Sequence, residues 1–81
     1  MHEYTLIQDL VEQAMSRMNA EKASGIKTIE VHVGKSSGYS EENLTQAFEI
    51  IAAESGLKAT KLVLKSIEGS DVFLQQIVLI N

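Results

Sequence analysis

The chain has 81 residues, of which 44% are hydrophobic and 22% are charged, and its formal net charge is −4 at pH 7. A chain of this length forms one small domain with a modest core. Its mild acidity and few aromatic residues argue against nucleic-acid binding, because no basic stripe is present to neutralise phosphates. The absence of cysteine excludes a disulfide scaffold, a thiolate zinc site and a cysteine nucleophile.

Nothing in the sequence predicts export or insertion into a membrane. No apolar run approaches the ~20 residues that span a bilayer. The first residues also lack the charged and then apolar pattern of a signal peptide. We therefore expect a cytoplasmic protein that does not bind a membrane.

An amphipathic helix is predicted at residues 5–22. Thr5 and Gln8 have the spacing of a capping box, in which each side chain bonds to the backbone of the other residue. Gly25 is expected to supply the left-handed turn that ends the helix. The apolar stripe of this helix consists of Leu6, Ile7, Leu10, Val11, Ala14, Met15 and Met18.

A second helix is predicted after Ser40, which can cap it. Glu41 and Glu42 occupy its first turn, where the helix dipole favours negative charge. Gly56 is expected to end it. The apolar stripe consists of Leu44, Ala47, Phe48 and Ile51.

Three strands are predicted, at residues 26–33, 60–67 and 72–80. The first alternates between apolar and polar residues, as a half-buried strand does. The other two are separated by the turn residues 69–71 and are expected to form an antiparallel hairpin. The residues expected to face the core are Ile29, Val31, Val33, Leu62 and Leu64.

This order predicts an α+β fold, α-β-α-β-β, with two helices packed on one face of a three-stranded sheet. The sequence leaves open whether the sheet is mixed or wholly antiparallel. The uncovered face is expected to be apolar and to make the chain self-associate as a homo-oligomer. It is predicted to hold Val63 with one of two sets, either Phe73, Ile77 and Leu79 or Val72, Leu74, Val78 and Ile80.

The sequence offers little for catalysis. It has no nucleophile elbow, no phosphate-binding glycine loop and no His-Glu-x-x-His helix. Ser36 and Ser37 are interpreted as turn residues, and Glu41 and Glu42 as partners of the helix dipole. We therefore predict that the chain is not an enzyme.

The first three residues, Met1, His2 and Glu3, have the spacing of a metal site. The terminal amine, the next amide nitrogen and the imidazole of His2 close compact chelate rings. Planar sets of nitrogen and oxygen donors suit Ni(II) and Cu(II) better than Zn(II). Glu3 adds either a donor or only negative charge. The alternative is a frayed terminus without function.

His32 lies on the polar side of the first predicted strand. We interpret it as a solvent-exposed histidine, since polar strand positions usually face water. The alternative is a second metal ligand, which requires that His32 lie near the N-terminus.

Three motifs together resemble the HypA family of hydrogenase nickel-insertion proteins, which includes the HybF type. They are MHEYTL at residues 1–6, VHVGKSSG at residues 31–38 and LTQAFE at residues 44–49. The resemblance implies an α/β domain that binds Ni(II) at Met1, His2 and Glu3, with backbone nitrogens completing the plane. It implies as partners a nickel-supplying GTPase and the large subunit of a NiFe hydrogenase, or urease accessory factors.

The chain departs from the family between its second and third strands. Where the family inserts two Cys-x-x-Cys pairs that hold zinc, this chain has only Glu68, Gly69, Ser70 and Asp71. We expect residues 1–81 to be a single nickel-binding domain without the zinc domain. The first hypothesis is a nickel metallochaperone, and the alternative is an interaction or regulatory module that keeps the fold. Hydrogenase or urease maturation genes beside its gene would favour the first.

Overall fold

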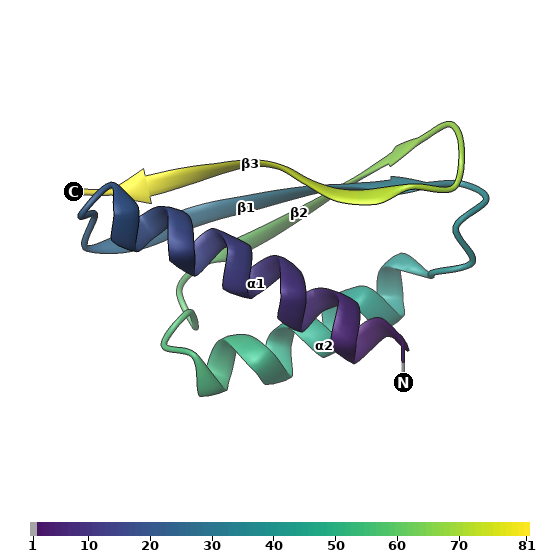
Figure 1. The fold of residues 1–81 in the computed structure, drawn as a ribbon. Coiled ribbons are helices and arrows are strands. Elements are labelled where there is room, and N and C mark those ends of the chain that lie inside the picture. The colour runs from purple at the N-terminus through teal and green to yellow at the C-terminus, as the bar shows by residue number, and fades with distance from the viewer. Residues whose placement is uncertain (1) are drawn as a thin grey trace.

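A computed structural model describes the backbone of residues 2–81 and the side chains of residues 3–81. Both helices lie on one face of the three-stranded sheet, as Figure 1 shows. The predicted α+β class, the element order and the position of the helices are confirmed. No helix in residues 2–81 is long and apolar enough to cross a membrane. The elements are α1 (His2–Ala20), β1 (Gly25–Gly34), α2 (Glu41–Glu54), β2 (Lys61–Ile67) and β3 (Val72–Ile80).

The sheet is mixed, because β1 lies between β2 and β3. β1 pairs with β2 in parallel and with β3 antiparallel. The predicted hairpin of the last two strands is therefore wrong, since β2 and β3 occupy opposite edges. The connection between them crosses the end of β1, where the N–H of Gly34 donates to the carbonyl of Asp71 at 2.7 Å. The backbones of β2 and β3 thus hydrogen-bond to β1, and not to each other as they would in a hairpin.

α1 begins at His2 rather than at Thr5, so the predicted capping box is wrong. Thr5 lies inside the helix, and the first turn is held by tertiary contacts. Tyr4 packs against the core, and its Oη donates to Glu54 Oε1 of α2 at 3.4 Å. Packing of an amphipathic face commonly outweighs a local capping signal in setting the start of a helix.

The end of α1 also differs from the prediction. The helix stops at Ala20, and Lys22 adopts the left-handed conformation with φ of 56°. The N–H of Ala23 then donates to the carbonyl of Met18 at 3.1 Å, as in a Schellman motif. Gly25 does not end the helix, because it is the first residue of β1.

α2 begins and ends as predicted. Ser40 is its N-cap, and the Oγ of Ser40 accepts a hydrogen bond from the N–H of Asn43 at 3.0 Å. Gly56 follows the C-cap with φ of 74°, a conformation that glycine adopts without strain. The predicted stripe of α2 is buried in the core.

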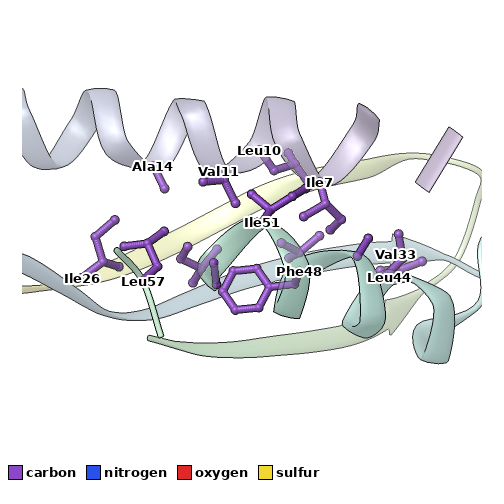
Figure 2. Packing of buried hydrophobic residues seen from close by; sticks show 14 residues of the cluster. Ile7, Leu10, Val11, Ala14, Ile26, Val33, Leu44, Phe48, Ile51 and Leu57 are labelled. Atoms are coloured by element: carbon purple, nitrogen blue, oxygen red, sulfur yellow. The ribbon is translucent and has the colours of Figure 1, made fainter. Parts of the chain in front are cut away.

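The core lies between the two helices and the inner face of the sheet (Figure 2). Both predicted helix stripes and the inward residues of β1 contribute to it. Its buried members are Ile7, Leu10, Val11, Ala14, Ile26, Ile29, Val31, Val33, Leu44, Ala47, Phe48, Ile51, Ala52 and Leu57.

The outer face of the sheet has no helix over it, and a β-bulge decides which residues of β3 lie there. Gln75 is the extra residue between Leu74, which pairs with Val31, and Gln76, which pairs with Glu30. One extra residue reverses the alternation of side chains along a strand. Neither of the two sets of β3 residues predicted for the uncovered face is therefore correct. The exposed apolar residues of β3 are Phe73, Val78 and Ile80, and those that pack on the core are Val72, Leu74, Ile77 and Leu79.

Candidate metal site

The predicted metal site falls at the start of α1. Met1 and the side chain of His2 lie outside the described residues, so the structure describes this site through the backbone from His2 onward and through Glu3. In a helix that begins at His2, the N–H groups of its first residues, His2 and Glu3, have no carbonyl acceptor within the helix. Their nitrogens are therefore not committed to helical hydrogen bonds. A metal that displaces an amide proton here breaks no bond of the helix.

Glu3 interacts with the helix dipole besides belonging to the predicted metal site. It lies in the first turn of α1, where a carboxylate interacts favourably with the helix dipole. Its side chain is half-buried rather than fully extended into water. Glu3 thus adds negative charge at the end of the helix at which the predicted ligands lie.

A shallow pocket of about 220 Å³ lies beside Glu3. Sequence reasoning missed this pocket, because its walls come from two helices whose crossing depends on tertiary packing. The one signal was Ile50, an apolar residue outside the core stripe of α2, which is 54% exposed. The lining residues are Glu3, Tyr4, Asn43, Gln46, Ala47 and Ile50.

The acidic start of α2 does not contribute to this pocket. Glu41 and Glu42 are exposed in the first turn of α2, as the dipole interpretation predicted, and neither lines the pocket beside Glu3. Among the side chains that the structure describes, no three His, Asp or Glu residues come together in a group that could hold a metal ion. A nickel site in this region therefore needs donors from the backbone and from the first two residues.

His32 lies on the face of the sheet opposite to both helices. Its Nε2 is 2.7 Å from Oε2 of Glu30, and its ring centroid is 5.4 Å from that of Phe73. Only 20% of the His32 side chain is exposed, so the histidine that was expected to be solvent-exposed is half-buried. The contact with Phe73 follows from the register of β3, which the sequence did not reveal. The structure does not bring His32 to the first turn of α1 and gives no support to a ligand role there.

Comparison with protein families gives a match to the HypA family, described as hydrogenase/urease nickel incorporation, metallochaperone, over residues 1–71. Comparison with curated proteins gives no match. Among solved structures, the chain is similar to the solution structure of the Ni metallochaperone HypA from Helicobacter pylori. The TM-score is 0.74 at 22% sequence identity, and the match covers 91% of this chain and 70% of that chain. This structural likeness shows a shared fold.

Proposed function

Because the chain belongs to the HypA family of metallochaperones for nickel incorporation into hydrogenase and urease, we propose that it binds Ni(II) as cargo at Met1, His2 and Glu3. The observation that carries the proposal is the start of α1 at His2, which leaves the amide nitrogens of His2 and Glu3 without helical acceptors. A helix that began at Thr5 would not hold these donors in a defined backbone geometry.

The proposed ligands are the terminal amine, the backbone amide nitrogen that follows it and the imidazole of His2. These three donors close two chelate rings, and their planar arrangement suits Ni(II). Glu3 supplies a fourth donor or a compensating negative charge. The pocket beside Glu3 is lined by the side-chain amides of Asn43 and Gln46 and by the carboxylate of Glu3. These groups can hydrogen-bond to a water molecule or to a protein group that completes the coordination of nickel.

We also propose that residues 1–81 act as one nickel-binding domain without a zinc domain. The chain has no cysteine to hold zinc, and Glu68–Asp71 already connects β2 to β3 across the end of β1. The proposed partners are a nickel-supplying GTPase and the large subunit of a NiFe hydrogenase, or urease accessory factors, in the cytoplasm. In this role the protein transfers a metal ion and catalyses no reaction.

Isothermal titration with Ni(II) tests the site. The chain that starts at Met1 is expected to bind one ion per chain. An N-terminal extension converts the amine to an amide, and His2→Ala removes the imidazole, so each should abolish binding. Glu3→Gln keeps the backbone nitrogen and should weaken binding less. Circular dichroism checks folding, which all variants should retain because the fully buried residues in the described part of α1 begin at Ile7.

The possible outcomes separate the two hypotheses. Equal affinity of the extended and unextended chains would show that the site lies elsewhere. Failure of the unextended chain to bind Ni(II) at all would instead support the alternative of an interaction module that keeps the fold.

A further inference from the structure

β3 is an edge strand without the features that usually protect an edge. The edge of β3 that points away from β1 has no backbone partner in the described part of the chain. Its sequence, VFLQQIVLI, contains no charged residue, no proline and no glycine. Edge strands of monomeric proteins usually carry such residues, because open backbone groups pair with other chains. The opposite edge strand, β2, is protected in this way by Lys61 and Lys65.

We propose that β3 pairs antiparallel with the β3 of a second copy of this chain, so that two sheets become one across a twofold axis. Such an interface is closed, because the same strand is used by both copies. Pairing of β3 with the β2 edge of another copy would leave a free edge at each end and would set lysines beside an apolar strand.

The exposed apolar surface of the sheet is concentrated at this edge. Phe73, Val78 and Ile80 of β3 are 39%, 39% and 47% exposed. Apart from Val63 on β2, the rest of the outer face is polar, with Glu30 and His32 on β1 and the two lysines on β2. Stacking of two sheets face to face would bury these charges at a cost, whereas edge pairing leaves them in water. The distribution therefore favours pairing along β3 over stacking.

The bulge at Gln75 limits the pairing to residues 76–80, in which β3 itself has no extra residue; the second shift in register, between Ile26 and Thr28, adds a residue to β1 instead. A twofold axis at Val78 sets Val78 opposite its own copy and Gln76 opposite Ile80 on the outer face. On the inner face it sets Ile77 opposite Leu79. Directly opposed β-branched and aliphatic side chains stabilise an antiparallel pair, and this register opposes no like charges.

The paired edge lies away from the proposed nickel site. α1 begins at the end of the sheet opposite to Ile80 (Figure 1). A second copy at residues 76–80 thus leaves the first turn of α1 open. The inference does not depend on nickel binding, and either proposal can fail without the other.

Sedimentation velocity over a concentration series tests the pairing with the wild-type chain and two variants. Val78→Lys sets two lysines opposite each other at the axis and should raise the dimer dissociation constant by roughly tenfold or more. Val63→Lys is the matched control, because Val63 pairs in register with Glu30 and so lies on the outer face, but on β2. It should dimerise like the wild type. Circular dichroism checks that both variants fold.

Hydrogen exchange provides a second measurement that needs no variant. Amide protection at residues 76–80 should increase with protein concentration, while protection in β2 should not change. A wild-type chain that stays monomeric at millimolar concentration would overturn the proposal. So would unchanged association of a folded Val78→Lys chain, or loss of association in Val63→Lys, which would indicate stacking of the outer faces.

Discussion

The N–H of Gly34, the last residue of β1, donates to the carbonyl of Asp71 at 2.7 Å, and a Cβ atom on Gly34 would lie 2.9 Å from the Asp71 nitrogen. It would also meet the carbonyl group of Gly69 more closely than real Cβ atoms approach other atoms. The connection from β2 to β3 therefore crosses directly over the end of β1. This crossing carries the chain from one edge of the sheet to the other in only four residues, Glu68–Asp71.

Gly34→Ala should destabilise the fold by about 1–3 kcal/mol, because the added methyl group meets backbone that cannot rotate away. Gly25→Ala, at the other end of the same strand, is the control. There the new Cβ would contact Ile80 Cδ1 at 3.6 Å, an ordinary separation, so the change should stay within about 0.5 kcal/mol. Urea unfolding followed by circular dichroism measures both. Equal losses of stability would contradict the proposed role of the crossing.

Nickel affinity should fall as the pH is lowered, because each nitrogen ligand must lose its proton before it binds. An α-amino group ordinarily has a pKa of about 7.7–8.0 and an imidazole about 6.5. Below these values protons compete with the metal, and affinity should drop by roughly tenfold per pH unit for each proton displaced. Titration calorimetry between pH 6 and 8 measures this, and a flat profile would argue against an amine and imidazole site.

Glu3→Gln should leave the shape of that pH profile unchanged. The substitution removes one negative charge, while the amine and the imidazole that lose protons on binding are the same in both chains. The variant should therefore show uniformly lower affinity across the profile. A change in the slope would indicate that Glu3 takes part in proton exchange at the site.

His32→Ala should leave nickel affinity unchanged, because His32 lies on the face of the sheet opposite to α1. It should still lower stability, by about 1 kcal/mol, through loss of the ring contact with Phe73 and of the interaction with Glu30. Calorimetry and urea unfolding measure the two effects separately. Weaker nickel binding in a variant of normal fold would restore His32 as a candidate ligand.

Thr60→Val should cost about 1–3 kcal/mol of stability although the two side chains have nearly the same shape. Thr60 is buried, and its Oγ1 donates to the carbonyl of Ile26 at 2.6 Å. Valine leaves that carbonyl without this donor. Thr28→Val on the outer face of β1 is the matched control and should change stability by less than about 0.5 kcal/mol. Thermal unfolding compares the two, and a neutral Thr60→Val would show that water replaces the hydroxyl.

The sequence alone predicted only those features of the candidate site that are fixed by the order of residues along the chain. The order of Met1, His2 and Glu3 is a property of the chain, and so are the spacing of the chelating atoms and the family motifs. The surroundings were not readable. Asn43 and Ile50 come next to Glu3 because α1 and α2 pack against each other, and no local pattern encodes which turns of two helices meet.

The sequence by itself determined the order of the elements and the core-facing residues of α1, α2 and β1. Apolar periodicity of 3.6 and 2.0 residues, the Ser40 cap and the Gly56 stop are local, so they could be read along the chain. Tertiary structure alone decided the strand order, the start of α1 and the outer face of β3. The reason is that pairing joins residues far apart in the chain, and side chains alternate with a period of two. The single extra residue Gln75 therefore places Phe73, Val78 and Ile80 on one face. Each of the two sets predicted from the sequence assumed that side chains alternate along β3 without interruption, so neither contained these three residues together.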